Sequence, residues 1–456
     1  MLKANTFATF IAFFVPVFFV TNLFSVITAF GWGLVNYHSY LAIAGLFLYL
    51  ILRPGLSTIV LVKEVSLISI FYCTFMFVCL SSLLFISNEP SSIQEFMGYA
   101  WMCIFCLGFV FAFKHEGMLK ATSYGSLVAV LLMSFINIYE FVDSDFRVYA
   151  NAVNDMEDVI VGRASRILGL HPDQNTSSYA IVFSVYVISY YLNKKLAILI
   201  AILSFFPVVA TFSRSGIVLW ALVLLLIAIT TDGGKLSIRG ALAGTFTLAL
   251  ITYMVLSGQL IELLINAGFE NSLDQDMRDR LSGNIFNQTD ASSGERKDLV
   301  SRSVEAFTSN PIGGIGLGIF GSDDIFDENS AHNMFLQLGA ELGLMGLASY
   351  VFLMAIPLFL KSWFAAKFSI LAIFVSLFTH TALWEPWFLY CTAMALVIIP
   401  RDARLKNDGN RRRNKSKKRK RRKKVKKSSH HSTLQHKSNT VSATVSLKQP
   451  QSSTDH

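Results

Sequence analysis

Residues 329–350 read NSAHNMFLQLGAELGLMGLASY, and this stretch passes from a polar loop into an apolar run. His332, Asn333 and Glu341 stand where the two meet. An α-helix needs roughly 17–25 predominantly apolar residues to cross a bilayer, and this run has that character. The polar side chains therefore have two interpretations. They mark the ordinary edge of a membrane helix, or they belong to a functional surface at that edge.

The rest of the chain repeats the pattern of long apolar runs and short charged connections. Of its 456 residues, 53% are hydrophobic, 15% are charged and 39 are phenylalanine. A large soluble core would instead show strands or helices with a polar face, which these runs lack. We predict an all-α polytopic membrane protein with about twelve transmembrane helices. The predicted spans are 6–29, 36–52, 65–87, 93–113, 119–140, 176–192, 196–211, 215–230, 240–257, 342–360, 368–384 and 387–399.

The net charge of +9 is unevenly distributed along the chain. Residues 401–456 hold 19 of the 39 Lys and Arg residues but three of the 30 acidic residues, so they carry +16 and the first 400 residues carry −7. We predict a multi-span membrane domain over 1–400 and a basic, disordered cytoplasmic tail over 401–456. In isolation RRRNKSKKRKRRKKVKK (411–427) resembles a nucleic-acid-binding run. Because it follows a membrane helix, we expect anionic lipid headgroups as its partners and no nucleic acid.

Lys and Arg residues set the orientation, because they resist translocation. With the N-terminus inside, every inner connection carries basic residues, and both termini are predicted to be cytoplasmic. The inner residues are Lys3, Arg53, Lys63, Lys114, Lys120, Lys194, Lys195, Lys235, Arg239, Lys361 and Lys367, followed by the tail. Two long loops, at about 141–175 and 258–332, then fall outside, and we expect them to carry short helices.

Several arginines stand in these acidic outer loops, where the positive-inside rule does not explain them. They are Arg147, Arg163, Arg166, Arg278, Arg280, Arg296 and Arg302. The turn TFSRSG (211–216) also falls outside and places Arg214 between two apolar helices. An ionised arginine at a membrane boundary either snorkels to water or points into the bundle. The sequence leaves both possibilities open for Arg214.

The second outer loop contains SGERKDLVSRSVEAFTSNPIGGIGLGIF (293–320). Residues 295–308 are predicted to form a helix that stops before Pro311. Arg296 and Arg302 do not share a face of it, so they need not share a ligand. The glycine-rich NPIGGIGLG resembles a phosphate cradle only superficially, because it follows no strand and lacks the P-loop lysine. A turn packed on the membrane surface is the better interpretation.

His332 is the candidate proton acceptor. A histidine at a helix start is most often structural, and Asn333 can cap the same helix. However, neutral imidazole accepts a proton from a hydroxyl group near pH 7, and arginines hold a departing diphosphate bidentately. These groups suit glycosyl transfer from a lipid diphosphate to a sugar hydroxyl. The sequence has no Asp-rich metal motif, so we expect the arginines to replace a divalent cation, with no metal and no cofactor.

The first outer loop closes with GRASRILGLHPDQNTSSYA (162–180). Arg166 and His171 fall outside, and either Asn175 or Thr176 is expected to cap the following span.

Four motifs occur in order: RILGLHPDQNTSSYA, TFSRSG, SGERKDL…NPIGGIGLG and AHNMFLQLGAELGLMGL. Over about residues 160–350 they resemble the bacterial O-antigen ligase and polysaccharide polymerase superfamily. The resemblance implies a GT-C-like, metal-independent glycosyltransferase at the outer face of the bacterial inner (plasma) membrane. It would move a glycan from undecaprenyl diphosphate to an acceptor glycan or lipid, in polysaccharide or lipopolysaccharide biosynthesis of the cell envelope.

The resemblance also implies roles for individual residues. Arg214, Arg296 and His332 match motif positions and are the catalytic candidates, the arginines for the diphosphate and His332 for the acceptor hydroxyl. Arg166, Arg302 and Asn333 are the substrate-binding candidates. Glu295 stands before Arg296, where many relatives have Gly directly before Arg, so either Arg296 or Arg302 contacts the lipid phosphate.

Two alternatives remain. A polymerase of the same superfamily, for an exopolysaccharide or capsule, is nearly as well supported as a ligase, and ten residues separate Arg302 from Gly313, a spacing found among polymerases. A flippase or transporter would show repeated halves, charges in mid-span and interrupted helices. The sequence has no internal repeat, and its charges gather at the outer boundary, so we rank this alternative lower.

Overall fold

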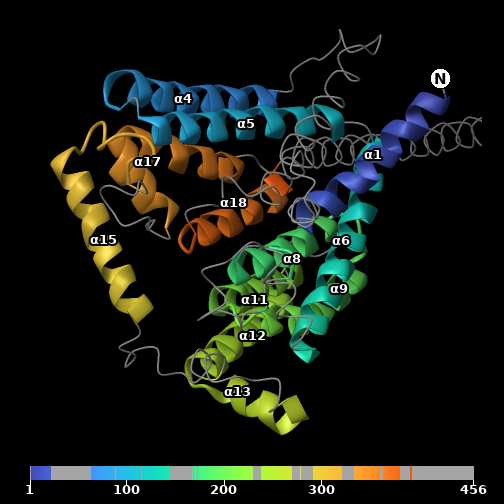
Figure 1. Cartoon of the computed structure of the whole chain (residues 1–456). Coiled ribbons are helices and arrows are strands. Elements are labelled where there is room, and N and C mark those ends of the chain that lie inside the picture. The colour runs from blue at the N-terminus through green and yellow to red at the C-terminus, as the bar shows by residue number, and fades with distance from the viewer. Residues whose placement is uncertain are drawn as a thin grey trace, which may run out of the picture. The chain divides into compact units, whose positions relative to one another are not determined.

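The computed structural model describes residues 2–21, 63–87, 89–113, 116–143, 167, 169–171, 173–229, 238–269, 278, 291–320, 333–359, 363–379 and 391–392. The principal helices, labelled in part in Figure 1, are α1 (Leu2–Val20), α4 (Lys63–Phe85), α5 (Pro90–Phe113), α6 (Glu116–Val142), α8 (Gln174–Ile188), α9 (Lys194–Leu203), α10 (Phe205–Ala210), α11 (Arg214–Ala228), α12 (Ile238–Leu256), α13 (Gln259–Leu264), the π-helix η3 (Ile265–Phe269), α15 (Ala291–Ser309), α17 (Met334–Phe359) and α18 (Trp363–Ser376).

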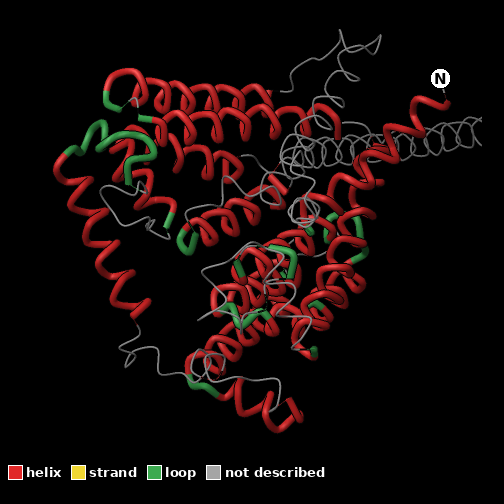
Figure 2. Tube along the Cα trace, viewed as in Figure 1, coloured by secondary structure: helices red, strands yellow, loops and turns green. Residues whose placement is uncertain are grey.

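The described residues form helices and loops without a strand (Figure 2). This confirms the all-α prediction for that part of the chain. By length and composition, Lys120–Val142 and Met334–Ala355 are long and apolar enough to cross a membrane. The pair Gly240–Met254 and Gln259–Phe269, bent by 89°, makes a third if it is one span. The expected number of about twelve is not confirmed, and the spans 36–52 and, apart from residues 391–392, 387–399 lie outside the described residues.

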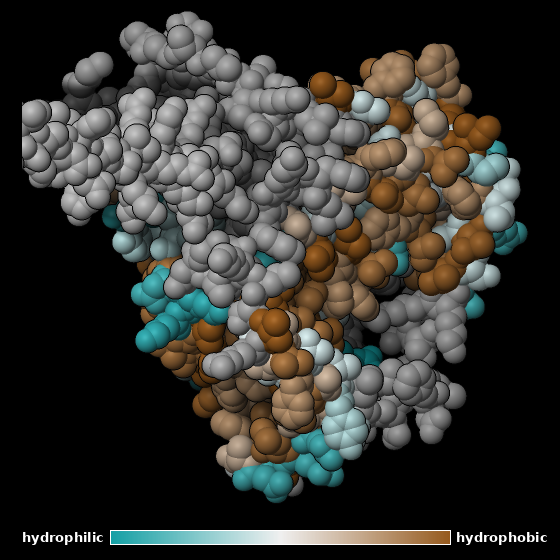
Figure 3. Space-filling model, turned by 180° about the vertical axis from the view of Figure 1, so that it is seen from behind, coloured by the Kyte–Doolittle hydropathy of each residue, from teal (hydrophilic) through white to brown (hydrophobic). Residues whose placement is uncertain are grey.

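Large apolar side chains cover much of the described surface, which is brown over wide areas of Figure 3. Many of them lie on α4, α6 and α12. Examples are Phe77, Leu84 and Phe85 on α4, Leu131 and Phe135 on α6, and Leu242, Phe246 and Tyr253 on α12. A water-exposed helix would place polar residues there. An apolar outer surface of this extent is what contact with lipid requires.

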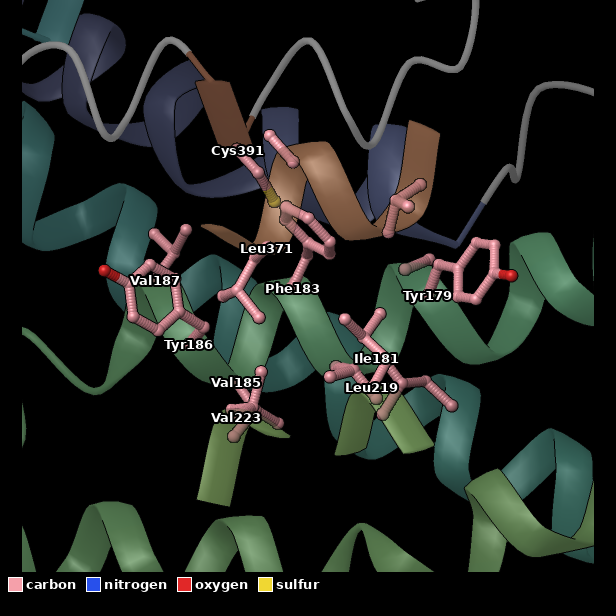
Figure 4. Close-up of a cluster of buried hydrophobic side chains, with 14 of the residues drawn as sticks. Tyr179, Ile181, Phe183, Val185, Tyr186, Val187, Leu219, Val223, Leu371 and Cys391 are labelled. Carbon is pink, nitrogen blue, oxygen red and sulfur yellow. The ribbon is translucent and has the colours of Figure 1, made fainter. Parts of the chain in front are cut away.

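The core is built around α8, whose side chains are buried on every face from Thr176 to Ile188. Figure 4 shows α8 between side chains of α11 and α18. Leu219 and Val223 are buried on α11, and the ring of Phe183 meets Phe368 of α18 edge-on, with centroids 5.9 Å apart. A helix that is apolar all round must be enclosed, and α8 is.

Two helices differ from the predicted spans. The span predicted at 196–211 consists of α9 and α10, which meet at Ser204. Pro207 has no amide hydrogen to donate to the carbonyl of Leu203, so one continuous helix is disfavoured there. The indole of Trp220 on α11 donates to the carbonyl of Ala201 at 2.5 Å and joins α11 to α9. In addition, α17 begins at Met334 and not at 342, so Glu341 lies inside the helix.

Candidate active site

The starts of α8 and α11 lie side by side, and their polar side chains form one hydrogen-bonded group. The hydroxyl of Ser213 donates to Oδ1 of Asn175 at 2.6 Å. The hydroxyl of Tyr179 donates to Oγ of Ser215, also at 2.6 Å. Because residues near both helix starts are bonded to each other, α8 and α11 begin at the same end of the bundle. The positive ends of both helix dipoles therefore lie at this end, where the carboxylate of Asp173 already accepts from first-turn amides of α8.

The turn TFSRSG fixes where α11 begins. Phe212 has a φ of 53°, a left-handed conformation that costs a residue other than glycine about 1–2 kcal/mol. Its buried ring lies beside that of Phe141, with centroids 6.0 Å apart, and this packing holds the turn. Oγ of Ser213 accepts from the amide of Gly216 at 3.0 Å and caps the helix. Arg214 is therefore the first residue of α11, and it is half-buried.

The cap of α8 corrects one expectation. Neither Asn175 nor Thr176 is the cap, because Oδ2 of Asp173 accepts from both of their amides, at 3.0 and 3.3 Å. The side chain of Asn175 is thereby left to bond Ser213. The two helices also approach very closely, since a Cβ at Gly216 would lie 2.1 Å from Oγ of Ser178.

The segment that closes the first outer loop packs onto the ends of α1 and α6. The amide of Gly169 donates to Oε2 of Glu140 at 3.0 Å. Nε2 of His171 lies 2.8 Å from the carbonyl oxygen of Val20. Complete burial lowers the pKa of His171 to about 4, although the bond to Val20 acts in the opposite direction. His171 is consequently a neutral structural residue.

The glycine-rich turn after α15 fills a break in α17. Gly343 has φ 61° and ψ −155°, a conformation that interrupts the helix and is essentially restricted to glycine. Peptide groups on both sides of the break pair with the turn. The bonds are Leu344 N to Pro311 O (2.8 Å), Met345 N to Ile312 O (3.5 Å), Ile315 N to Ala340 O (2.9 Å) and Gly316 N to Glu341 O (3.0 Å). These amides donate to backbone carbonyls of the protein and not to a ligand. This agrees with a packed turn and not with a phosphate cradle.

Glu341, two residues before the break at Gly343, also contacts this turn. Its side chain is buried, and Oε1 accepts from Nε2 of Gln337 at 2.5 Å. Oε2 of Glu341 is buried without a hydrogen-bond partner among the described residues. The contact with the turn is made by the backbone carbonyl of Glu341, which accepts from the amide of Gly316.

The O-antigen ligase family model matches residues 199–351. This match supports membership of the O-antigen ligase superfamily. No curated protein matches the chain. The matched residues contain the TFSRSG turn, α15, the glycine-rich turn and the part of α17 that it contacts. The O-antigen ligase match thus includes the start of α11 and the broken helix, while α8 and the first outer loop precede it.

The structure describes three of the six candidate residues with their side chains. Arg214 is half-buried at the start of α11, and Arg302 is exposed on α15. Asn333 caps α17, because Oδ1 accepts from the amides of Phe335 and Leu336 at 3.0 and 3.2 Å. Nδ2 of Asn333 also donates to the carbonyl of Leu377 at 3.2 Å. The expected capping by Asn333 is confirmed.

The other three candidates are less well defined. Arg296 lies within α15 (Ala291–Ser309), which confirms the helix predicted over 295–308, but nothing is described of its side chain. Arg166 and His332 lie outside the described residues. Arg214 and Arg302 stand on different helices with different neighbours, because α11 packs on α8 and α12 while α15 packs on α17. Their roles toward a ligand stay predictions.

The sequence reasoning did not single out the polar group of Asn175, Tyr179, Ser213 and Ser215. Its only signal is that short polar segments precede two apolar runs. Such segments are common at helix starts, and nothing local shows that two of them meet.

Proposed function

We propose that the protein is a membrane glycosyltransferase that moves a glycan from undecaprenyl diphosphate to an acceptor at the outer face of the bacterial inner membrane. One observation carries this proposal: the O-antigen ligase match includes the turn that fixes Arg214 at the anion-attracting start of α11. An ionised, half-buried arginine beside two helix starts suits a diphosphate held at a membrane boundary.

The reaction assigns one role to each group. The acceptor hydroxyl oxygen attacks the anomeric carbon of the donor glycan, and the bond from that carbon to the diphosphate oxygen breaks. Arg214, with Arg296 or Arg302, binds the diphosphate and stabilises the charge that it gains as it leaves. His332 accepts the proton of the acceptor hydroxyl. Arg166 and Asn333 help to bind the substrates. The arginines take the place of a divalent cation.

The proposed sidedness follows from the charges and from two contacts at opposite ends of α11. At one end, Ser213 bonds Asn175. At the other, Nζ of Lys194 donates to the carbonyl of Ala228, the last residue of α11, at 2.7 Å. Because Lys194 belongs to the basic inner connections, the polar group at Asn175 faces outward and both termini are cytoplasmic.

A polymerase that extends a chain on the lipid carrier is the second candidate, because it shares the family and the chemistry. A flippase is the third. The break in α17 is a feature of transporter helices, but here the glycine-rich turn occupies it. A transporter needs such peptide groups for its substrate, so this occupancy favours the transferase.

Deletion of the gene followed by gel analysis of envelope glycans tests the proposal. For a ligase, long chains disappear from the acceptor and accumulate on undecaprenyl diphosphate. For a polymerase, single repeat units remain on the carrier. Accumulation of repeats at the inner face would contradict the transferase assignment and support a flippase.

A further inference from the structure

The two residues that flank Arg214 in the chain are both bonded to side chains of α8. Before Arg214, the hydroxyl of Ser213 donates to Oδ1 of Asn175 at 2.6 Å. After it, Oγ of Ser215 accepts from the hydroxyl of Tyr179 at 2.6 Å. A residue whose two chain neighbours are both held has little freedom to shift its own backbone. The place of Arg214 therefore depends on side chains of another helix.

The hydrogens of this group have a defined direction. Oγ of Ser213 accepts from the amide of Gly216 at 3.0 Å, so its own hydrogen is available for Asn175. Oγ of Ser215 receives the hydrogen of Tyr179 and lies 3.4 Å from both Oδ1 of Asn175 and Oγ of Ser213. Each of the three hydroxyl groups thus has an acceptor for its hydrogen. Removal of one member of such a network loosens the others.

Helix capping does not require the two bonds between the helices. Asp173 caps α8, and Ser213 caps α11 through the amide of Gly216. The Asn175–Ser213 and Tyr179–Ser215 bonds add a fixed position of one helix start relative to the other. Tyr179 and Ser213 are each only 1% exposed, so water competes little for these bonds. The residue whose position they determine is Arg214.

We propose that Tyr179 and Asn175 are positioning residues for Arg214: they hold Ser215 and Ser213, and so keep Arg214 where the donor diphosphate is bound. This inference rests on the proposed function for its catalytic consequence. The attachment of α11 to α8 is tested without reference to any reaction. Both positioning residues precede the segment that the O-antigen ligase model matches, 199–351.

The first experiment compares Tyr179→Phe with Tyr186→Phe in the purified full-length protein. Each variant loses one buried hydroxyl of α8 and keeps the ring, but Tyr186 lies away from the start of α11 (Figure 4). Hydrogen–deuterium exchange is measured at the amides of Gly216 and Ile217, which both bond Ser213. Exchange should accelerate in Tyr179→Phe and stay close to wild type in Tyr186→Phe. Unchanged exchange in Tyr179→Phe, or equal acceleration in both, would overturn the proposal.

The second positioning residue is tested by a conservative rescue. Asn175→Ala removes the acceptor of Ser213, whereas Asn175→Asp keeps an oxygen at that place. Exchange at Gly216 and Ile217 should accelerate in the alanine variant and return toward wild type in the aspartate variant. Only exchange is compared for this pair, because an added negative charge near a diphosphate would itself alter transfer. Equal acceleration in both variants would contradict a role for the bond to Ser213.

The tyrosine variants are then assayed for glycan transfer from undecaprenyl diphosphate. Tyr179→Phe should lower kcat by roughly 10- to 100-fold, because a displacement near 1 Å costs on the order of 100-fold. The fall in kcat should exceed any rise in KM, since the arginine stabilises charge that develops as the diphosphate leaves. Tyr186→Phe should remain close to wild type. Equal losses in the two variants would indicate a merely structural role.

Two double variants show the route by which Tyr179 acts. Ser215→Ala breaks the same bond from α11, so Tyr179→Phe should add little to its loss of kcat. A flexible lysine needs exact placement less than a planar guanidinium does. Tyr179→Phe should therefore cost much less in Arg214→Lys than in wild type. Full additivity in either pair would mean that Tyr179 does not act through Ser215 and Arg214.

Exchange and transfer fail separately. Wild-type protein that transfers no glycan would remove the proposed function, and with it the catalytic part of this inference, even if exchange follows the expected pattern. Transfer by wild type with normal exchange in Tyr179→Phe would remove the inference and leave the function. If Tyr179→Phe does not fold, Ser215→Ala is measured in its place against Tyr186→Phe, with the same expected results.

Discussion

At the scale of single residues, the position of Arg214 depends on the strained backbone of Phe212. Phe212 adopts a positive φ, and the turn that it forms delivers Arg214 to the first position of α11. Strained residues at a ligand site are a recurrent way to preorganise it. The turn thus fixes the backbone position of Arg214 at the start of α11.

Arg214→Lys tests whether that group binds a diphosphate through two parallel hydrogen bonds. Lysine keeps the charge but loses the planar fork, so we expect kcat/KM to fall by roughly 100-fold, near 3 kcal/mol of transition-state stabilisation. Transfer by the reconstituted protein measures this. The control Lys195→Arg changes a basic residue at the other end of the bundle and should keep activity. Full activity in Arg214→Lys would mean that a point charge is sufficient.

Metal removal tests the replacement of a cation by arginines. Activity should persist in excess chelator, because the guanidinium groups neutralise the leaving diphosphate. Measured turnover before and after dialysis against chelator decides the matter. Loss of activity that added Mg²⁺ or Mn²⁺ restores would contradict a metal-independent mechanism.

His171 makes stability dependent on pH. Its folded pKa of about 4 lies below the ordinary value of 6.5, so its neutral form contributes stability that is fully present above pH 6.5. This contribution is lost as pH falls toward 4, by up to about 3 kcal/mol. The melting midpoint should therefore drop more between pH 7.5 and 5 in wild type than in His171→Gln, which cannot titrate. Equal drops would show that His171 is not the group responsible.

At the scale of elements, the glycine-rich turn and α17 form one unit. The break at Gly343 exposes peptide groups inside an apolar helix, where unpaired groups are costly. The turn supplies their partners. The glycine-rich motif resembles a nucleotide site, but its bonds to the peptide groups at the break of α17 explain it.

Gly343→Ala and Gly339→Ala compare two glycines four residues apart in α17. A Cβ at Gly343 would lie 2.5 Å from the carbonyl of Ile312 and would adopt a forbidden conformation, whereas at Gly339 the nearest atom is 3.7 Å away. We expect Gly343→Ala to lose about 3 kcal/mol or more and Gly339→Ala to keep wild-type stability. Thermal unfolding in detergent, with activity as a second readout, measures both. Equal stability would mean that the break is not required.

At the scale of the whole molecule, the apolar surface and the basic tail determine how the protein meets a membrane. Side chains such as Phe77 and Leu131 suit lipid. The tail over 401–456 lies outside the described residues, and its binding to anionic headgroups stays a prediction.

Truncation of residues 411–456 should leave kcat for glycan transfer unchanged and weaken binding to anionic vesicles. Each basic residue near such a surface contributes about 1 kcal/mol to binding. A full-length variant with neutral residues at 411–427 is the matched control, because it keeps the length of the tail and loses the charge. Vesicle co-sedimentation of a synthetic tail peptide, beside turnover of the truncated enzyme, gives both readouts. Lost turnover in a correctly inserted truncation would assign the tail a direct role.

The sequence by itself determined the helical class of the described residues, the resemblance to the O-antigen ligase superfamily and the helix that carries Arg296 and Arg302. Hydropathy and charge are summed along the chain, so they require no knowledge of contacts. Ordered motifs identify a family for the same reason. The capping by Asn333 was also predictable, because a cap bonds amides only two or three residues away.

Only the tertiary structure decided that Glu341 is buried inside α17, that Asp173 and not Asn175 caps α8, and that Asn175 meets Ser213. Each depends on a partner that is distant in sequence or on competition between neighbouring caps. Gly343 shows the reason most directly. Its residue type permits a break, but in lipid the peptide groups at the break need hydrogen-bond partners. The glycine-rich turn packed beside Gly343 supplies them.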